Sequence, residues 1–88
     1  MNTIELIREK LAALAPKQLE IVDDSELHAG HQGSKGGGGH YNLVIVSPQF
    51  AGQNTVTRHR MIYTALADMM QTKIHALSIK AFTPEEFH

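Results

Sequence analysis

The sequence predicts an α+β protein in which two helices pack on one face of a three-stranded mixed sheet. Three observations support this fold class. Two segments have the apolar spacing of amphipathic helices, three short runs carry strand signals, and 88 residues are enough for only one core. We therefore expect a single domain over residues 1–88, a two-layer sandwich with the element order αββαβ.

The first helix is expected from about Thr3 to Ala15, because apolar residues recur there at every third or fourth position. Pro16 disfavours helical geometry at the residue before it and therefore marks the end of this helix. A short strand follows at Leu19–Val22. The turn-forming sequence Asp-Asp-Ser at 23–25 ends that strand.

Residues 26–39 contain six of the seven glycines in the chain and show no apolar periodicity. This composition predicts a flexible Gly/His-rich loop, too long for a tight hairpin turn. The strand signal that follows, His40–Ser47, is rich in β-branched residues and is stopped by Pro48. The loop should join the first two strands in an antiparallel pair.

A second helix is expected from an N-cap at Thr55 to about Gln71. Its apolar stripe is predicted to comprise Val56, His59, Ile62, Tyr63, Leu66, Met69 and Met70. The third strand is expected at Ile74–Ala81 and is ended by Thr83 and Pro84. Because the second strand reaches the third through a helix, these two strands should pair in parallel.

This topology predicts two separate candidate sites. The glycine-rich loop enters the second strand at the end where the parallel third strand also begins, so His28, His31 and His40 should gather near His75. The second helix begins at the opposite end of the sheet. The Arg-His-Arg sequence at 58–60 therefore belongs to a different surface.

Histidine clusters are candidate metal sites, because imidazole binds zinc, copper, nickel and iron. His28 and His31 have a spacing that can chelate an ion from a loop, but a glycine-rich loop is a poorly preorganised ligand set. His75 alternates in register with Leu77 and Ile79, which is also typical of a hydrogen-bonded core histidine. The residues alone leave both interpretations open.

The start of the second helix carries Arg58 and Arg60, although positive charge there opposes the helix dipole. A bound anion such as phosphate would account for the two arginines. The alternative is an ordinary solvated face formed by Arg60, Thr64 and Asp68, with His59 filling the apolar stripe. The spacing alone is compatible with either.

Composition excludes several classes of function. Eight Lys and Arg against nine Asp and Glu give a net charge of −1, which argues against non-specific coating of nucleic acid or anionic membrane. The absence of cysteine excludes thiolate nucleophiles and zinc–thiolate sites. No triad or paired-carboxylate arrangement stands out. We expect a cytoplasmic protein that is not an enzyme and does not enter a membrane.

Several stretches resemble the BolA family. The matching segments are Leu19–Ser25, His40-Tyr41 with Val44–Ser47, Phe50-x-Gly52, Val56-x-Arg58-His59-Arg60-Met61-Ile62-Tyr63, Ile74–Leu77 and Thr83–Glu85. They span nearly the whole chain in the order found in that family. The resemblance implies an αββαβ fold similar to a type II K-homology domain, in agreement with the topology argued above.

The resemblance also implies an adaptor in iron–sulfur cluster trafficking or iron homeostasis. Such proteins bind a monothiol glutaredoxin with glutathione and share a 2Fe–2S cluster with it. The partner supplies thiolates and this chain supplies histidine, so no cluster is expected in the isolated chain. Alone, the chain is expected to be a monomer or a weak homodimer. His75 matches the C-terminal ligand of the family. His28 best matches the loop ligand, with His31 and His40 as competitors.

Some members of the family are DNA-binding transcriptional regulators associated with the stress response. DNA binding through Arg58 and Arg60 is therefore the alternative function. The GxxG loop of nucleic-acid-binding K-homology domains is missing, because Ala51–Asn54 contains a single glycine.

Overall fold

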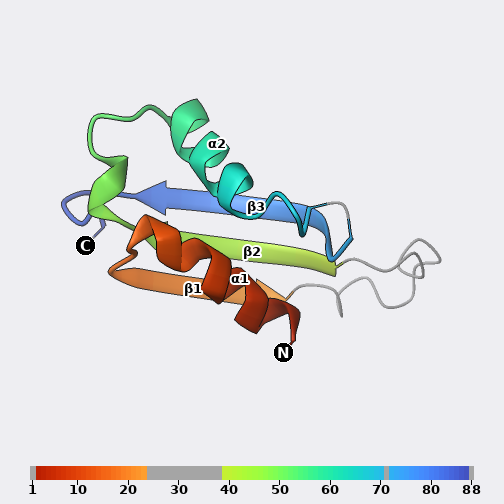
Figure 1. Cartoon of the computed structure of the whole chain (residues 1–88). Coiled ribbons are helices and arrows are strands. Elements are labelled where there is room, and N and C mark those ends of the chain that lie inside the picture. The colour runs from red at the N-terminus through yellow and green to blue at the C-terminus, as the bar shows by residue number, and fades with distance from the viewer. Residues whose placement is uncertain (1, 24–38, 71, 88) are drawn as a thin grey trace.

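The computed structural model describes residues 2–23, 39–70 and 72–87. Two α-helices lie on one face of a three-stranded sheet, as Figure 1 shows, so the predicted α+β class and element order are confirmed. The elements are α1 (Thr3–Leu11), η1 (Ala12–Leu14), β1 (Gln18–Asp23), β2 (Gly39–Val46), η4 (Pro48–Phe50), α2 (Thr55–Ala65) and β3 (Ile74–Phe82). Within the described residues, no helix has the length and apolar character needed to cross a membrane.

The central strand of the sheet is β2, with β1 antiparallel on one side and β3 parallel on the other. The strand directions match the prediction. Tyr41, near the start of β2, is paired with Leu77, and Val46, at its end, is paired with Phe82. The beginnings of β2 and β3 therefore lie at one end of the sheet, and α2 begins at the other end (Figure 1).

The first helix is shorter than expected. Asn2 caps it, with its side-chain oxygen accepting a hydrogen bond of 2.8 Å from the backbone N–H of Glu5. The α-helix ends at Leu11 and continues for one 3₁₀ turn, after which Ala15 adopts a left-handed conformation with φ of 48°. Pro16 accounts for this ending, because it disfavours the right-handed helical conformation at Ala15.

The second helix differs from the prediction at both ends. Its N-cap is Asn54 rather than Thr55, because the Asn54 side-chain oxygen accepts a hydrogen bond of 2.8 Å from the Thr57 N–H. Its last residue is Ala65 rather than Gln71. The chain leaves α-helical geometry at Leu66 and passes through turns toward β3.

The predicted apolar stripe of α2 divides between two faces. Ile62 and Leu66 are fully buried, and Met69 is almost so. Val56 and Tyr63, however, are 63% and 40% exposed. The prediction that these two side chains belong to the core stripe is therefore wrong, since the turn of the helix carries them to the solvent side.

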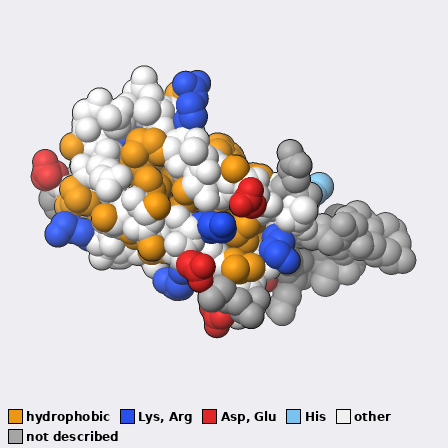
Figure 2. Space-filling view, viewed as in Figure 1, with side chains coloured by type: hydrophobic (Ala, Val, Ile, Leu, Met, Phe, Trp, Pro, Cys, Tyr) orange, Lys and Arg blue, Asp and Glu red, His pale blue; other side chains and the backbone are white. Residues whose placement is uncertain are grey.

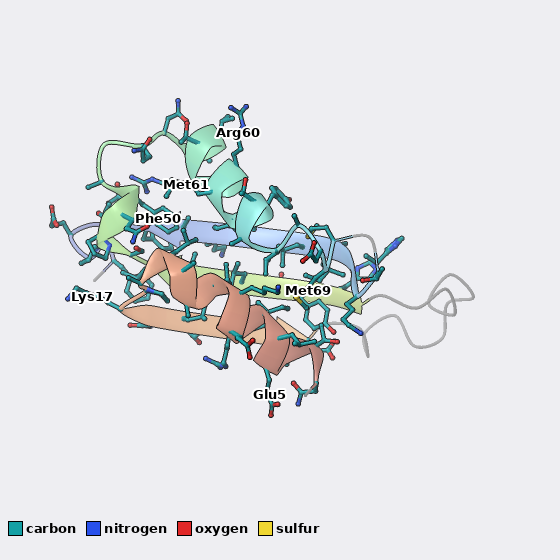
Figure 3. All side chains as sticks on the ribbon, viewed as in Figure 1. Glu5, Lys17, Phe50, Arg60, Met61 and Met69 are labelled. Carbon is teal, nitrogen blue, oxygen red and sulfur yellow. The ribbon has the colours of Figure 1, made fainter. Side chains whose placement is uncertain are left out.

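The core lies between the helices and the sheet. Its fully buried apolar side chains are Ile7, Leu11, Leu43, Ile45, Phe50, Ile62, Leu66 and Ile74. Phe50 and Met69 lie between the two layers, whereas Glu5, Lys17 and Arg60 are exposed (Figure 3).

One buried polar residue, Ser47, fixes the end of β2. Its hydroxyl donates a hydrogen bond of 2.6 Å to the Leu14 carbonyl and accepts one of 3.1 Å from the Gln49 N–H. The short loop that leads from there to α2 turns at Gly52, whose φ of 77° favours glycine.

Candidate functional site

The rings of His40 and His75 lie side by side where β2 and β3 begin. Their centroids are 5.3 Å apart and their planes are inclined by 39°. His75 is exposed and His40 is half-buried. The sequence predicted that these two residues would meet at this end of the sheet, and the structure confirms their proximity.

An irregular register brings the two histidines together. Gly39 is paired with Ile74, but the next residue, His40, is paired with Ala76, so His75 is an extra residue in the ladder. Ile74 is only 2% exposed and faces the core. The shift removes His75 from the apolar face that carries Leu77, so the interpretation of His75 as a buried core histidine is wrong.

Two imidazoles at this spacing can ligate one metal ion. A tetrahedral ion bound about 2.1 Å from one nitrogen of each ring would hold the two ring centroids roughly 5 Å apart, close to the separation found here. The described residues contain no cluster of three or more His, Cys, Asp or Glu side chains that could hold a metal ion. The pair formed by His40 and His75 would therefore need ligands from elsewhere to complete a tetrahedral site.

The other two predicted loop ligands, His28 and His31, lie outside the described residues. Their predicted approach to His75 stays a prediction. Most of the predicted glycine-rich loop, 26–39, also lies outside, although Gly39 already belongs to β2.

At the opposite end of the sheet, the Arg58 side chain is fixed by hydrogen bonds to other parts of the chain. Its Nε donates a hydrogen bond of 2.9 Å to the Gln53 carbonyl, and its Nη1 donates one of 3.1 Å to the Ala81 carbonyl. The two terminal nitrogens also bind the Glu86 carboxylate at 2.6 and 3.1 Å. The guanidinium lies 5.9 Å from the centre of the Phe50 ring, and the side chain is only 13% exposed.

These contacts change the acidity of both charged groups. The guanidinium of Arg58, with hydrogen bonds from the Thr83 backbone N–H and hydroxyl, lowers the pKa of Glu86 from 4.5 to about 2. The hydrogen bond to Glu86 raises the pKa of Arg58. Sequence reasoning did not identify Glu86, because nothing in a short C-terminal sequence shows that its turn folds back to α2.

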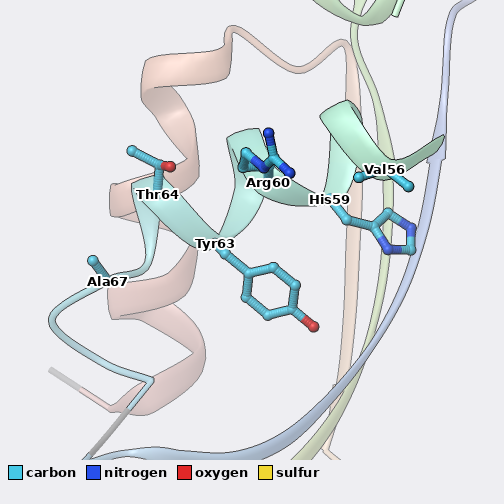
Figure 4. A pocket seen from close by; sticks show the side chains of 6 residues that line it. All are labelled: Val56, His59, Arg60, Tyr63, Thr64 and Ala67. Carbon is cyan, nitrogen blue, oxygen red and sulfur yellow. The ribbon is translucent and has the colours of Figure 1, made fainter. Parts of the chain in front are cut away.

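Arg60, in contrast, is exposed and has no hydrogen bond or ion pair within the described residues. The acid expected to share its helix face, Asp68, instead lies 3.7 Å from the Lys10 ammonium. The side chain of Arg60 lines a shallow groove of about 580 Å³ on the outer side of α2 (Figure 4). The groove is lined by Val56, His59, Arg60, Tyr63, Thr64 and Ala67.

Fold and site together define a small αββαβ protein that presents two neighbouring imidazoles at one end of its sheet and an arginine-bearing helix on its surface. A family model described as BolA-like protein matches residues 11–86. The chain belongs to the BolA-like family, and the predicted resemblance is confirmed. BolA-like proteins are not known as enzymes.

Individual relatives agree with this assignment. SufE-like protein 1, chloroplastic/mitochondrial, from Arabidopsis thaliana is 49% identical over 91% of this chain, which spans only 23% of that protein. The DNA-binding transcriptional regulator BolA of Escherichia coli (strain K12) is 43% identical over 94% of this chain and 77% of the relative. The solved structure of BolA1 from Arabidopsis thaliana has a TM-score of 0.86 at 44% identity, covering 100% of this chain and 98% of that one.

The relatives come from plant organelles and from a bacterium. The cytoplasmic location of this chain therefore stays a prediction.

Proposed function

We propose that this chain is an adaptor that binds a monothiol glutaredoxin and contributes histidine ligands to a shared 2Fe–2S cluster, in iron–sulfur cluster trafficking or iron homeostasis. The observation that carries the proposal is the pair of rings formed by His40 and His75, 5.3 Å apart at an accessible end of the sheet. Membership of the BolA-like family supports it, since the resemblance implies this role.

The chemistry of the chain fits half of such a cluster. A 2Fe–2S cluster needs two protein or thiol ligands on each iron, and two histidines can replace two cysteines on one iron, as they do in Rieske centres. This chain has no cysteine, so thiolates must come from elsewhere. The glutaredoxin cysteine and glutathione would supply the two thiolates of the other iron.

The proposal assigns one ligand and leaves two candidates for the second. His75 is common to the sequence resemblance and to the observed pair. The geometry favours His40 as the second ligand, because it is the histidine that lies beside His75. The resemblance favours His28, which lies outside the described residues.

The test is anaerobic reconstitution of this chain, alone and with a monothiol glutaredoxin and glutathione. We expect a coloured mixed complex whose reduced state shows histidine ligation by paramagnetic resonance, and no stable cluster in the isolated chain. His75→Ala should keep the fold and weaken the histidine signature, because it removes one of the two imidazoles. A stoichiometric, stable cluster on the isolated chain would overturn the proposed division of ligands.

DNA binding is a second candidate function, favoured by the name of the Escherichia coli relative and by the exposed guanidinium of Arg60. The net charge of −1 predicts weak binding that is lost as salt rises. Titration of a labelled duplex library at two salt concentrations tests this. A salt-resistant, sequence-selective complex that is lost in Arg60→Ala would make DNA binding the main function. Arg58→Ala is a poor probe, because Arg58 is part of the fold.

A further inference from the structure

The helix α2 has two apolar faces, of which only one is used by the core. Ile62 and Leu66 face the sheet and are fully buried. On the outer side, Val56 and Tyr63 lie two helical turns apart, and Ala67 follows in the turn after the helix; Val56 is 63% and Tyr63 40% exposed. A helix that covers a sheet ordinarily presents polar residues to solvent. The outer side of α2 therefore carries exposed apolar side chains among His59, Arg60 and Thr64, and they have no partner in the described part of the chain.

A second groove adjoins the first. It measures about 380 Å³ and is lined by Leu14, Thr57, Arg60, Met61 and Thr64. Arg60 and Thr64 line both grooves, so they form a ridge between two apolar hollows. Figure 2 shows hydrophobic side chains over α2 and between α2 and α1, with a basic side chain projecting beside them. In Figure 3 the Arg60 side chain points outward from the helix. We call the two grooves and their ridge the α2 surface.

The charge on the α2 surface is positive and uncompensated. The helix α2 contains no acidic residue. The nearby cations Arg58 and Lys10 are matched by Glu86 and Asp68, respectively. Arg60 is matched by no acid in the described residues. A guanidinium flanked by apolar side chains is a strong and directional partner for a carboxylate.

We propose that the α2 surface docks an acidic, amphipathic segment of a partner protein. A carboxylate of the segment would bind the Arg60 fork, and apolar side chains on either side of it would enter the two grooves. This is the arrangement by which an amphipathic helix binds an apolar groove. The proposal goes beyond cluster sharing, since it uses neither His40 nor His75.

The chemistry of the surface distinguishes a peptide from a nucleic acid. A nucleic-acid site needs several cations that follow the phosphate backbone. The α2 surface offers one unmatched arginine among apolar side chains, on a chain whose net charge is −1. A protein segment with both acidic and apolar residues fits this combination better.

The experiment is selection of random peptides, displayed on phage, against the whole chain, with Arg60→Glu as the counter-selection. We expect enriched peptides to combine Asp or Glu with Leu, Ile, Phe or Trp. The affinity of a synthetic enriched peptide for the Arg60→Glu variant should be about tenfold lower or more, because the variant loses one charged hydrogen-bonded pair. Lys17→Glu is the matched control, because it makes the same charge change at another exposed cation and should leave binding unchanged.

Chemical-shift mapping of the peptide on the labelled chain completes the test. Shifts confined to Val56, Met61, Tyr63 and their neighbours support the proposal. It is overturned if enriched peptides lack acids, bind Arg60→Glu as tightly as the parent, or map to the end of the sheet that carries His75. A failure to enrich any peptide over the counter-selection also overturns it. Tighter, Arg60-dependent binding of a DNA duplex that displaces the peptide would assign the surface to nucleic acid instead.

Discussion

The guanidinium of Arg58 and the carboxylate of Glu86 form a two-point ion pair, with nitrogen–oxygen distances of 2.6 and 3.1 Å. The pair joins the first turn of α2 to the turn that follows β3. That turn is itself closed by a hydrogen bond of 2.9 Å from the Thr83 N–H to Glu86 Oε1. The rings of Phe82 and Phe87 lie 5.4 Å apart, which ties the residue after Glu86 to the end of the strand. The C-terminal turn is thus an integral part of the fold.

Loss of this clamp should destabilise the protein. We expect Arg58→Ala to lower the free energy of unfolding by about 2–3 kcal/mol, because it removes charged hydrogen bonds from a side chain that is largely buried. Arg58→Lys should recover only part of the loss, since an ammonium lacks the planar fork. Urea denaturation gives the values. Arg60→Ala is the control, because its exposed side chain has no partner among the described residues, and it should change stability by less than about 0.5 kcal/mol.

The same pair makes stability depend on acid pH. The pKa of Glu86 is lowered from 4.5 to about 2 in the folded chain, so its carboxylate binds protons more readily when the chain is unfolded. The stabilisation is therefore complete above about pH 4.5 and is lost as pH falls toward 2. Glu86→Gln should be less stable than the parent near neutral pH, and its stability should fall less steeply between about pH 4.5 and 2. Thermal melts of both proteins across the range test the prediction, and parallel pH profiles would contradict it.

Much of the fold followed from short-range patterns. The β-branched run in β2 and the breaks at Pro16 and Pro48 identified the elements, and the kind of connection between strands, first a loop and then a helix, predicted the strand directions. The errors arose where one turn or one residue decides which way a side chain faces. The predicted apolar stripe of α2 included exposed residues, because periodicity alone does not distinguish a second apolar face from the face that packs on the core.

The site was predictable to a similar extent. Parallel pairing was enough to bring His40 and His75 to one end of the sheet. The exposure of His75 was not predictable, because the extra residue arises from how β2 and β3 pair and not from the sequence of β3 alone. An extra residue in one strand changes the face of the sheet on which the neighbouring side chains lie. The contact of Arg58 with Glu86 joins residues from distant parts of the chain, and no local pattern encodes it.

The two faces of α2 should respond differently to truncation. Ile62 is fully buried, so Ile62→Ala should lower the free energy of unfolding by about 2–5 kcal/mol through lost burial and a residual cavity. Val56 lies on the outer face of the same helix and is 63% exposed. Val56→Ala should therefore change stability by less than about 0.5 kcal/mol. Equal losses in the two variants would show that the outer face is packed in the isolated chain.

The last prediction identifies the second histidine ligand of the mixed cluster complex. If His40 and His75 ligate the same iron, His40→Ala and His75→Ala should each remove one imidazole, with similar changes in visible circular dichroism and in the paramagnetic resonance of the reduced complex. His28→Ala should then have little effect. If His28 is the ligand instead, the pattern of His40→Ala and His28→Ala is reversed. His59→Ala is the matched control, because α2 begins at the end of β3 that carries Ala81, about 20 Å along the strand from His75. A cluster spectrum that changes in His59→Ala and is unchanged in His75→Ala would refute the placement of the site at this end of the sheet.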